Sequence, residues 1–299
     1  MHSNLSIDVF KKYFSYFCLT SYYDEKIEFT DGEIKRYIAR GLKIENAKVN
    51  KDHFLRDLQE SVCVIQRDGL NLVFTHRTFQ EFFVAYCLAR LSKKHFRPII
   101  EKIANRWSDN VMQMLYDMNN DLLETEYLLP AAQELLSSFD RAVEKVDYLH
   151  KYCEGRNMRV LISHDEEPRF IGDDRNTIRG VLRQLFRKEF KTAVAAKFAR
   201  YRRLDRIAMK EAGGALLKET GQKSLVLEIQ VEPSGECTAS VQSRNGLTGP
   251  TVNAEWFRKS GFASYAHDEM DFVRAVTDRL SEKAAKRNTT LEKLFGIED

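Results

Sequence analysis

The hydrophobic pattern of the first 92 residues changes its period near residue 61, and this change limits the folds that the segment can adopt. Before it, apolar side chains recur every three or four positions, which predicts a helix that buries Phe10, Tyr13, Phe14 and Phe17. After it, apolar residues alternate on both sides of the Arg-Asp-Gly turn at 67–69. An Asp-Gly turn between alternating runs predicts a β-hairpin.

Local signals divide this segment further. Thr30 and Glu33 can form a capping box, which predicts a second helix through Arg40 with Gly41 as its stop. Asn50 can cap a third helix that carries Phe54, Leu55 and Leu58 inward, and Thr-Phe-Gln-Glu at 78–81 is a second capping box after the hairpin. Three helices, a two-stranded wing and a closing helix predict a winged-helix domain over residues 1–92.

The rest of the chain divides into a helical connector, 93–155, and a C-terminal domain, 156–299. The connector keeps helical spacing and is interrupted at Asn119-Asn120 and at Pro130. In the C-terminal domain we expect three strands, at 159–162, 224–231 and 237–241. An acid-rich loop at 165–174 leads into a basic helical stretch at 175–210, which Gly213-Gly214 interrupt. A Gly- and Pro-containing loop at 246–250 precedes a last helix at 269–287. The predicted fold class is α+β.

The composition is typical of a soluble globular protein, with 43% hydrophobic and 30% charged residues. The longest uncharged apolar run, 82–89, is far shorter than the roughly 20 residues of a membrane-spanning helix, and the N-terminus has no signal-peptide pattern. Five scattered cysteines without a Cys-x-x-Cys pair indicate neither a disulfide framework nor a zinc site. We therefore expect a cytoplasmic protein with no membrane association and no metal.

Positive charge is concentrated in one segment. Residues 175–210 contain 12 Lys or Arg and two acidic residues, although the net charge of the chain is +3. Five cations recur every four residues and would form one row on a continuous helix: Arg175, Arg179, Arg183, Arg187 and Lys191. Such a row is either a solvated face or a binding surface for nucleic acid or an acidic protein.

One motif points to a known family. Residues 74–85 read Phe-Thr-His-Arg-Thr-Phe-Gln-Glu-Phe-Phe-Val-Ala, which resembles the winged-helix signature of NACHT-family STAND NTPases, Phe-x-His-x-Ser/Thr-Phe-Gln-Glu-Phe/Tyr-Phe-x-Ala. Residues 57–64 and 127–130 also resemble the corresponding segments of bacterial members of this family. The resemblance is specific over 51–90, extends over 8–150 and is absent beyond about residue 155.

The resemblance implies a regulatory and sensing part of a switch in antiphage defence signalling. In this family the winged-helix histidine, here His76, contacts the β-phosphate of ADP held by an upstream nucleotide-binding domain and so stabilises the resting state. The implied parent uses ATP or ADP with magnesium, responds to a phage-derived or other trigger, and oligomerises on activation.

The residues around His76 also allow a simpler interpretation. At a strand-to-helix junction, an imidazole and the first backbone amides of the helix can face an anion together, but a histidine there can equally cap the helix or pack. We expect Phe79, Phe82 and Phe83 in the core, and Gln80 and Glu81 as cap and interdomain hydrogen-bonding groups.

The chain contains no Gly-x-x-x-x-Gly-Lys-Ser/Thr loop, so we expect no ATPase activity from it alone and no cofactor bound to it. Gly-Gln-Lys-Ser at 221–224 has the wrong spacing and precedes a predicted strand. The expected nucleotide-binding core would then lie upstream, with Met1 as either an internal start or a cloning boundary.

Three alternatives concern other segments. Residues 160–165 resemble the first strand of a TIR domain, which would make the C-terminal part an NAD-cleaving enzyme; this hypothesis requires a parallel sheet within 158–299. His164 with the acids at 165–167 could bind a metal, although neighbouring loop residues rarely converge on one ion. The third helix of a winged helix often binds DNA, but residues 51–60 carry two basic and three acidic residues, which favours packing against protein.

Overall fold

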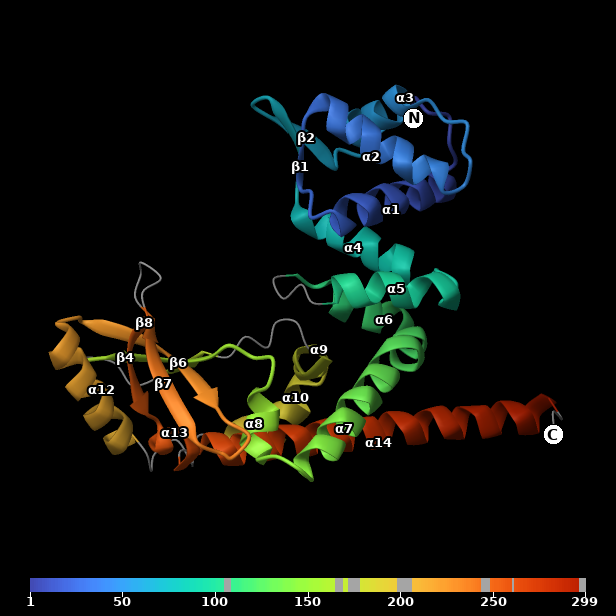
Figure 1. The fold of residues 1–299 in the computed structure, drawn as a ribbon. Helices are drawn as coiled ribbons and strands as arrows, with labels where there is room; N and C mark the ends of the chain where they lie inside the picture. The colour runs from blue at the N-terminus through green and yellow to red at the C-terminus, as the bar shows by residue number, and fades with distance from the viewer. Residues whose placement is uncertain are drawn as a thin grey trace. The chain divides into compact units, whose positions relative to one another are not determined.

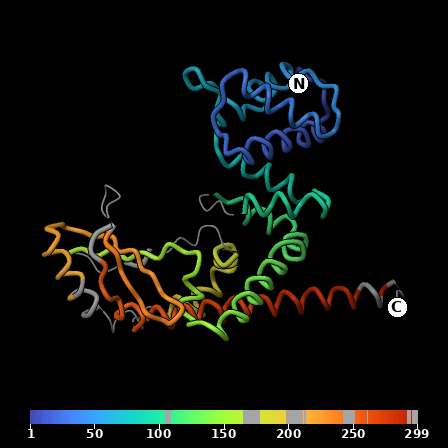
Figure 2. The backbone as a smooth tube through the Cα atoms, in the orientation of Figure 1, coloured from blue at the N-terminus to red at the C-terminus, as the bar shows by residue number. Residues whose placement is uncertain are grey.

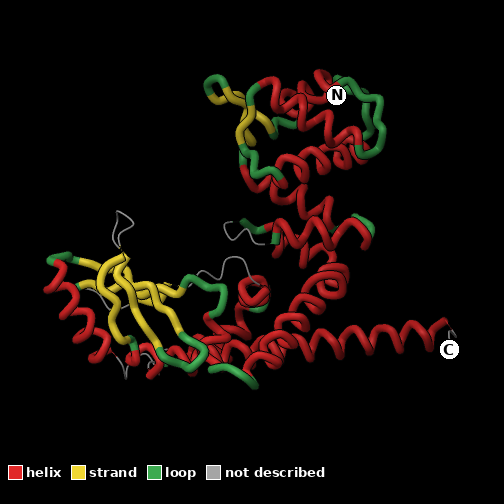
Figure 3. Tube along the Cα trace, viewed as in Figure 1, coloured by secondary structure: helices red, strands yellow, loops and turns green. Residues whose placement is uncertain are grey.

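The computed structural model describes residues 1–104, 109–164, 169–171, 178–197, 206–242, 248–259 and 261–295 (Figure 2). The chain forms two compact units, unit 1 from Met1 to Tyr127 and unit 2 from Leu128 to Asp299. Both combine helices with a small antiparallel sheet, so the α+β class is confirmed (Figure 3). The division between the units falls inside the segment expected as a connector.

The elements of unit 1 are, in chain order, α1 (Ile7–Tyr23), β1 (Glu28–Phe29), α2 (Asp31–Lys43), α3 (Lys51–Arg56), a π-helical turn η1 (Asp57–Ser61), β2 (Ile65–Asp68), β3 (Asn71–Phe74), α4 (Arg77–Leu88), α5 (Lys93–Ile103), α6 (Val111–Leu123) and a second π-helical turn η2 (Glu124–Leu128) (Figure 1).

The sheet of unit 1 has the order β1-β3-β2, and both strand pairs are antiparallel. The predicted hairpin is confirmed, with Ile65 opposite Phe74 and Asp68 opposite Asn71. Its turn is one residue later than expected, because Gly69 adopts a φ of 57° that glycine tolerates without strain. Leu70 is therefore at the tip, 90% exposed, and does not point inward.

The two predicted helix caps are confirmed, whereas the predicted end of the second helix is wrong. The Thr30–Glu33 capping box is present and Asn50 accepts from the amides of Asp52 and His53, as predicted. The expected stop at Gly41 is wrong, since α2 continues to Lys43. A Cβ on Gly41 would lie 2.9 Å from the backbone N of Phe17, so this glycine allows α1 and α2 to approach closely.

Aromatic rings fill the core of unit 1 between α1 and the elements packed on it. Phe14 and Phe17 of α1 are buried, and Phe17 lies 5.8 Å from both Phe29 and Phe74, measured between ring centroids. The break predicted near Asn119 is a kink within α6, where Asn119 Nδ2 donates to the carbonyl oxygen of Ala89 at 2.9 Å. This bond fixes α6 at the end of α4.

The elements of unit 2 are α7 (Leu129–Val143), α8 (Tyr148–Cys153), β4 (Met158–Ser163), β5 (Arg169–Ile171), α9 (Ile178–Leu185), α10 (Arg187–Phe190), a π-helical turn η3 (Lys191–Ala195), α12 (Arg206–Thr220), β6 (Ser224–Val231), β7 (Cys237–Gln242), β8 (Thr248–Asn253), α13 (Glu255–Lys259) and α14 (Phe262–Phe295) (Figure 1). Pro130 lies in the first turn of α7, and the last helix is longer than predicted.

The sheet of unit 2 has the order β5-β4-β6-β7-β8, and every strand pair is antiparallel. This arrangement overturns the TIR-like alternative, which required a parallel sheet. β8 is also a correction, because residues 248–250 were expected in a loop. Strand pairing with β7 stabilises this Gly- and Pro-containing segment at the sheet edge, where proline is tolerated.

One face of this sheet is buried, and it contributes Val160, Leu227 and Ala239 to a core with Tyr152 and Phe257. The expected interruption at Gly213-Gly214 is wrong, since α12 runs through both glycines. A Cβ on Gly213 would lie 2.4 Å from Cγ2 of Ile162 in β4. The glycine is needed for close packing of the helix on the sheet and does not end the helix.

Candidate functional site

His76 lies between β3 and α4 and is the N-cap residue of α4. Its Nδ1 accepts the backbone N–H of Thr78 at 3.2 Å, and the N–H of Phe79 donates to the His76 carbonyl oxygen at 3.0 Å. These bonds replace the predicted capping box of Thr78 and Glu81, which is a correction. A neutral ring whose Nδ1 accepts carries its proton on Nε2, so Nε2–H is a donor on an exposed side chain.

The aromatic residues that follow His76 do not share one environment. Phe79 and Phe82 are 42% and 41% exposed, which corrects their expected place in the core. Phe83 packs on Phe14, with ring centroids 4.5 Å apart. The buried face of α4 is formed by smaller residues, including Val84 and Ala85. An imidazole and two phenyl rings are thus presented at the first half of α4.

Gln80 and Glu81 act inside unit 1. Gln80 is fully buried, and its Nε2 donates to Ser21 Oγ at 3.0 Å and to the Lys26 carbonyl oxygen at 2.9 Å. The buried carboxylate of Glu81 lies 3.3 Å from Arg77 Nε. Gln80 therefore holds α4 on α1 and on the loop that follows α1, and Glu81 pairs within α4, so neither residue caps the helix as predicted.

A buried carboxylate organises the segment before β2. Asp57 in η1 accepts the backbone N–H of Ser3 at 2.9 Å and the Ser61 hydroxyl at 2.9 Å, and it also accepts the Ser3 hydroxyl and the His2 amide. Burial raises its pKa, but these donors outweigh burial and lower the pKa of Asp57 to about 2. The carboxylate is ionised at neutral pH.

The link from η1 to β2 also supports the residue before His76. Cys63 has a φ of 53°, a strained backbone for a residue with a side chain. Its carbonyl oxygen accepts the Thr75 hydroxyl at 3.1 Å, and the Thr75 N–H donates to Val64 O at 3.0 Å. The position of His76 therefore depends on η1 as well as on the hairpin.

The predicted cationic row does not form one accessible face. Arg175 lies outside the described residues, α9 ends at Leu185, and Arg179 is only 6% exposed. Arg187 and Lys191 are exposed, on α10 and η3. The continuous helix that the row required is broken because Phe186 leaves helical geometry, with φ −107° and ψ 43°.

Arg183 turns inward because a carboxylate from α14 is available there. Glu269 is 1% exposed and accepts from Arg183 and from the Tyr152 hydroxyl, and Arg156 Nη2 lies 3.6 Å from it. The Arg156 and Arg179 guanidinium carbons lie 4.2 and 4.9 Å from the Tyr152 ring centroid. Burial and the nearby Glu269 carboxylate raise the pKa of Tyr152, which therefore remains a hydrogen-bond donor.

The remaining site predictions concern metals and membranes. His164 is exposed, and the acids at 165–167 lie outside the described residues. Among the residues that the structure does describe, no group of three His, Cys, Asp or Glu side chains could hold a metal ion. Within the same residues, no helix combines the length and the apolar character needed to cross a membrane.

No family model matches the chain, and comparison with curated proteins and with solved structures finds no similar protein. The family resemblance therefore depends on sequence alone, that is, on residues 74–85 together with residues 57–64 and 127–130.

Sequence reasoning missed Asp57, Cys63 and the exposure of Phe79 and Phe82. One signal was available in the sequence. Gln80, Val84 and the small or aliphatic residues that follow Val84 recur at helical spacing, and this spacing alone marks the buried face of α4. The large aromatic residues concealed this pattern. Nothing in the sequence marks the strained backbone at Cys63.

Proposed function

We propose that this chain is the regulatory part of a NACHT-type STAND NTPase and that residues 1–92 are its winged-helix domain. The order helix, strand, helix, helix, strand, strand in α1 to β3 supports the proposal, together with the motif at 74–85. In this proposal a separate nucleotide-binding domain holds ADP, and His76 donates a hydrogen bond to its β-phosphate.

The observation that carries the proposal is the orientation of the His76 ring. Its Nδ1 is held by the Thr78 amide, which leaves Nε2–H for an acceptor outside unit 1. Phosphate oxygens are strong acceptors, and they also favour the N-terminal end of a helix such as α4. The exposed rings of Phe79 and Phe82 provide apolar area beside His76 on which a domain carrying the nucleotide can pack.

The test is to replace His76 by Ala and by Gln in the protein that contains the nucleotide-binding domain. Loss of one hydrogen bond to a charged phosphate corresponds to about a tenfold weaker hold on ADP. We expect His76→Ala to retain less ADP on purification and to raise basal activity, and His76→Gln to restore part of the ADP because its amide is also a donor. Bound ADP is measured by chromatography of the released nucleotide.

A matched control is His95→Ala, because His95 is also exposed and its Nδ1 lies 3.0 Å from Ser92 Oγ at the start of α5. This control should retain ADP as the unmodified protein does. Unchanged ADP content in His76→Ala would contradict the proposed contact.

The proposal includes a cytoplasmic location, a phage-derived or other trigger, and oligomerisation of the parent on activation. These features come from the family resemblance. Expression with and without phage infection, followed by size-exclusion chromatography, tests the last two: a phage-independent monomer in every condition would contradict them.

A further inference from the structure

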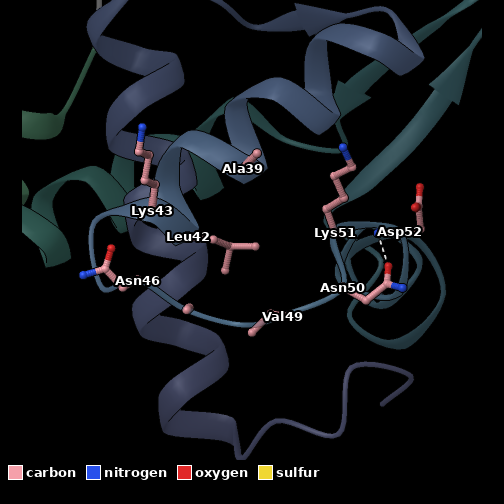
Figure 4. A pocket seen from close by; sticks show the side chains of 9 residues that line it. Ala39, Leu42, Lys43, Asn46, Val49, Asn50, Lys51 and Asp52 are labelled. Carbon is pink, nitrogen blue, oxygen red and sulfur yellow. Dashed lines mark hydrogen bonds between the residues drawn. The ribbon is translucent and has the colours of Figure 1, made fainter.

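A pocket opens on unit 1 between the end of α2 and the segment that leads into α3 (Figure 4). Its volume is about 520 Å³, within the range of pockets that bind small ligands. Ala39, Leu42 and Val49 supply its apolar lining. In Figure 4 the Leu42 side chain points into the middle of the pocket, with Lys43 on one side and Lys51 on the other.

The rim of the pocket is cationic. Lys43 and Lys51 line the opening and are exposed, and neither has an ion pair among the described residues. Lys48, in the segment between them, is exposed as well. The only acids between residues 43 and 52, Glu45 and Asp52, are occupied by other lysines.

Lys12 Nζ lies 2.9 Å from Glu45 and Lys35 Nζ lies 2.6 Å from Asp52. Hydrogen bonds from these lysines lower the pKa of Glu45 and of Asp52, so both acids are ionised at neutral pH. They are therefore committed to Lys12 and Lys35, and the rim lysines can bind an external anion.

The combination of lining and rim selects a partner chemistry. The floor of the pocket is apolar, and cations lie on either side of the opening. This arrangement fits a peptide with one apolar side chain and a carboxylate on each side of it. A long polyanion fits less well, because residues 31–60 carry seven basic and six acidic residues and their excess of positive charge is small. We propose that this pocket binds an acidic peptide segment with a single apolar anchor residue. The site uses no residue of the His76 contact and stands without the proposed function.

The test uses the full chain and fluorescence anisotropy of a labelled peptide, Gly-Asp-Glu-Asp-Leu-Asp-Glu-Asp-Gly. We expect saturable binding that becomes about tenfold weaker in the double variant Lys43→Gln, Lys51→Gln, the loss that two partly exposed ion pairs can account for. A peptide with Ser in place of its Leu should also bind more weakly, because the floor of the pocket would be left unfilled.

The matched control is Lys11→Gln with Lys94→Gln, which removes the same charge from exposed positions on α1 and α5 of unit 1. Binding to this control should not change, and circular dichroism should show that both double variants are folded. Absence of saturable binding, or equal weakening in both double variants, overturns the proposal. Displacement of the peptide by a single-stranded oligonucleotide of equal charge, at lower concentration than unlabelled peptide, overturns it in favour of nucleic acid.

Discussion

His76 in unit 1 and Arg183 in unit 2 are both polar residues near the end of a structural element, yet one is exposed and the other is held by a carboxylate. The His76 ring is oriented by a neighbour in sequence, the Thr78 amide, and the preceding residue Thr75 is held by Cys63 across the same hairpin. Arg183 is positioned by Glu269, which is 86 residues away along the chain. When bonds to near neighbours orient a side chain, its outward direction can be predicted from the local sequence. A partner that is distant in sequence can turn a side chain inward instead.

Among the substitutions that test this difference between His76 and Arg183, we expect Glu269→Gln to have the largest effect on stability. The substitution removes the charge that accepts from Arg183 and Tyr152 in a buried setting. Breaking a buried ion pair costs about 3–5 kcal/mol, so the free energy of unfolding of unit 2 should fall by about that amount. Urea denaturation followed by far-UV circular dichroism measures the change.

Glu282→Gln is the matched control, because Glu282 lies on the same helix with its side chain 71% exposed. Its cost should stay within about 0.5 kcal/mol. If both substitutions cost the same, the inward cluster does not stabilise unit 2 and the contrast with His76 fails.

A second, intermediate effect concerns the local support of His76. The pKa of Asp57 is about 2, below its ordinary value of 3.8, because donors in the folded state favour its ionised form. A lowered folded-state pKa contributes stability above pH 3.8, here about 2 kcal/mol, and this contribution is lost as the pH falls toward 2. The gap in unfolding free energy between the unmodified protein and Asp57→Asn should thus narrow from pH 5 to pH 2.

For comparison, Asp117→Asn changes an exposed carboxylate on α6 in the same unit. Its free energy of unfolding should track that of the unmodified protein across the whole titration. If the difference in unfolding free energy between the unmodified protein and Asp57→Asn stays constant with pH, the folded-state donors do not stabilise the ionised carboxylate.

The smallest effect tests the cationic row directly. Arg187 and Lys191 are exposed, so the double variant Arg187→Gln, Lys191→Gln should change the free energy of unfolding by no more than about 0.5 kcal/mol. Arg183→Gln should cost more, about 2 kcal/mol, because it removes a charged donor from the buried Glu269 carboxylate and leaves Arg156 Nη2 at 3.6 Å. Equal costs at all three positions would mean that the row behaves as one face.

Features with a local cause could be predicted from the sequence. The α+β class, the hairpin at β2 and β3, and the caps at Thr30 and Asn50 all follow from periodicity and from hydrogen bonds between near neighbours. The same is true of the location of His76 between a strand and a helix. Each depends on interactions that close within a few residues.

Several of the errors share a long-range cause. Gly41 and Gly213 were expected to end or interrupt helices, but close contact with Phe17 and Ile162 explains them. Strand β8 was expected as a loop, and its pairing with β7 decides its conformation. In α4, the packing of smaller residues on α1 leaves Phe79 exposed. Local propensity contains no information about such partners.

The contact between Gly213 and Ile162 also limits how this part of the chain can vary in length. Helix α12 can lie against β4 only where it has no side chain, so a shift of α12 by one residue would bring a Cβ into the space that Ile162 occupies. An insertion or deletion between Arg206 and Thr220 would force either that collision or a new path for the helix. Changes of length should therefore be accepted in residues 221–223, between α12 and β6, and rejected within α12.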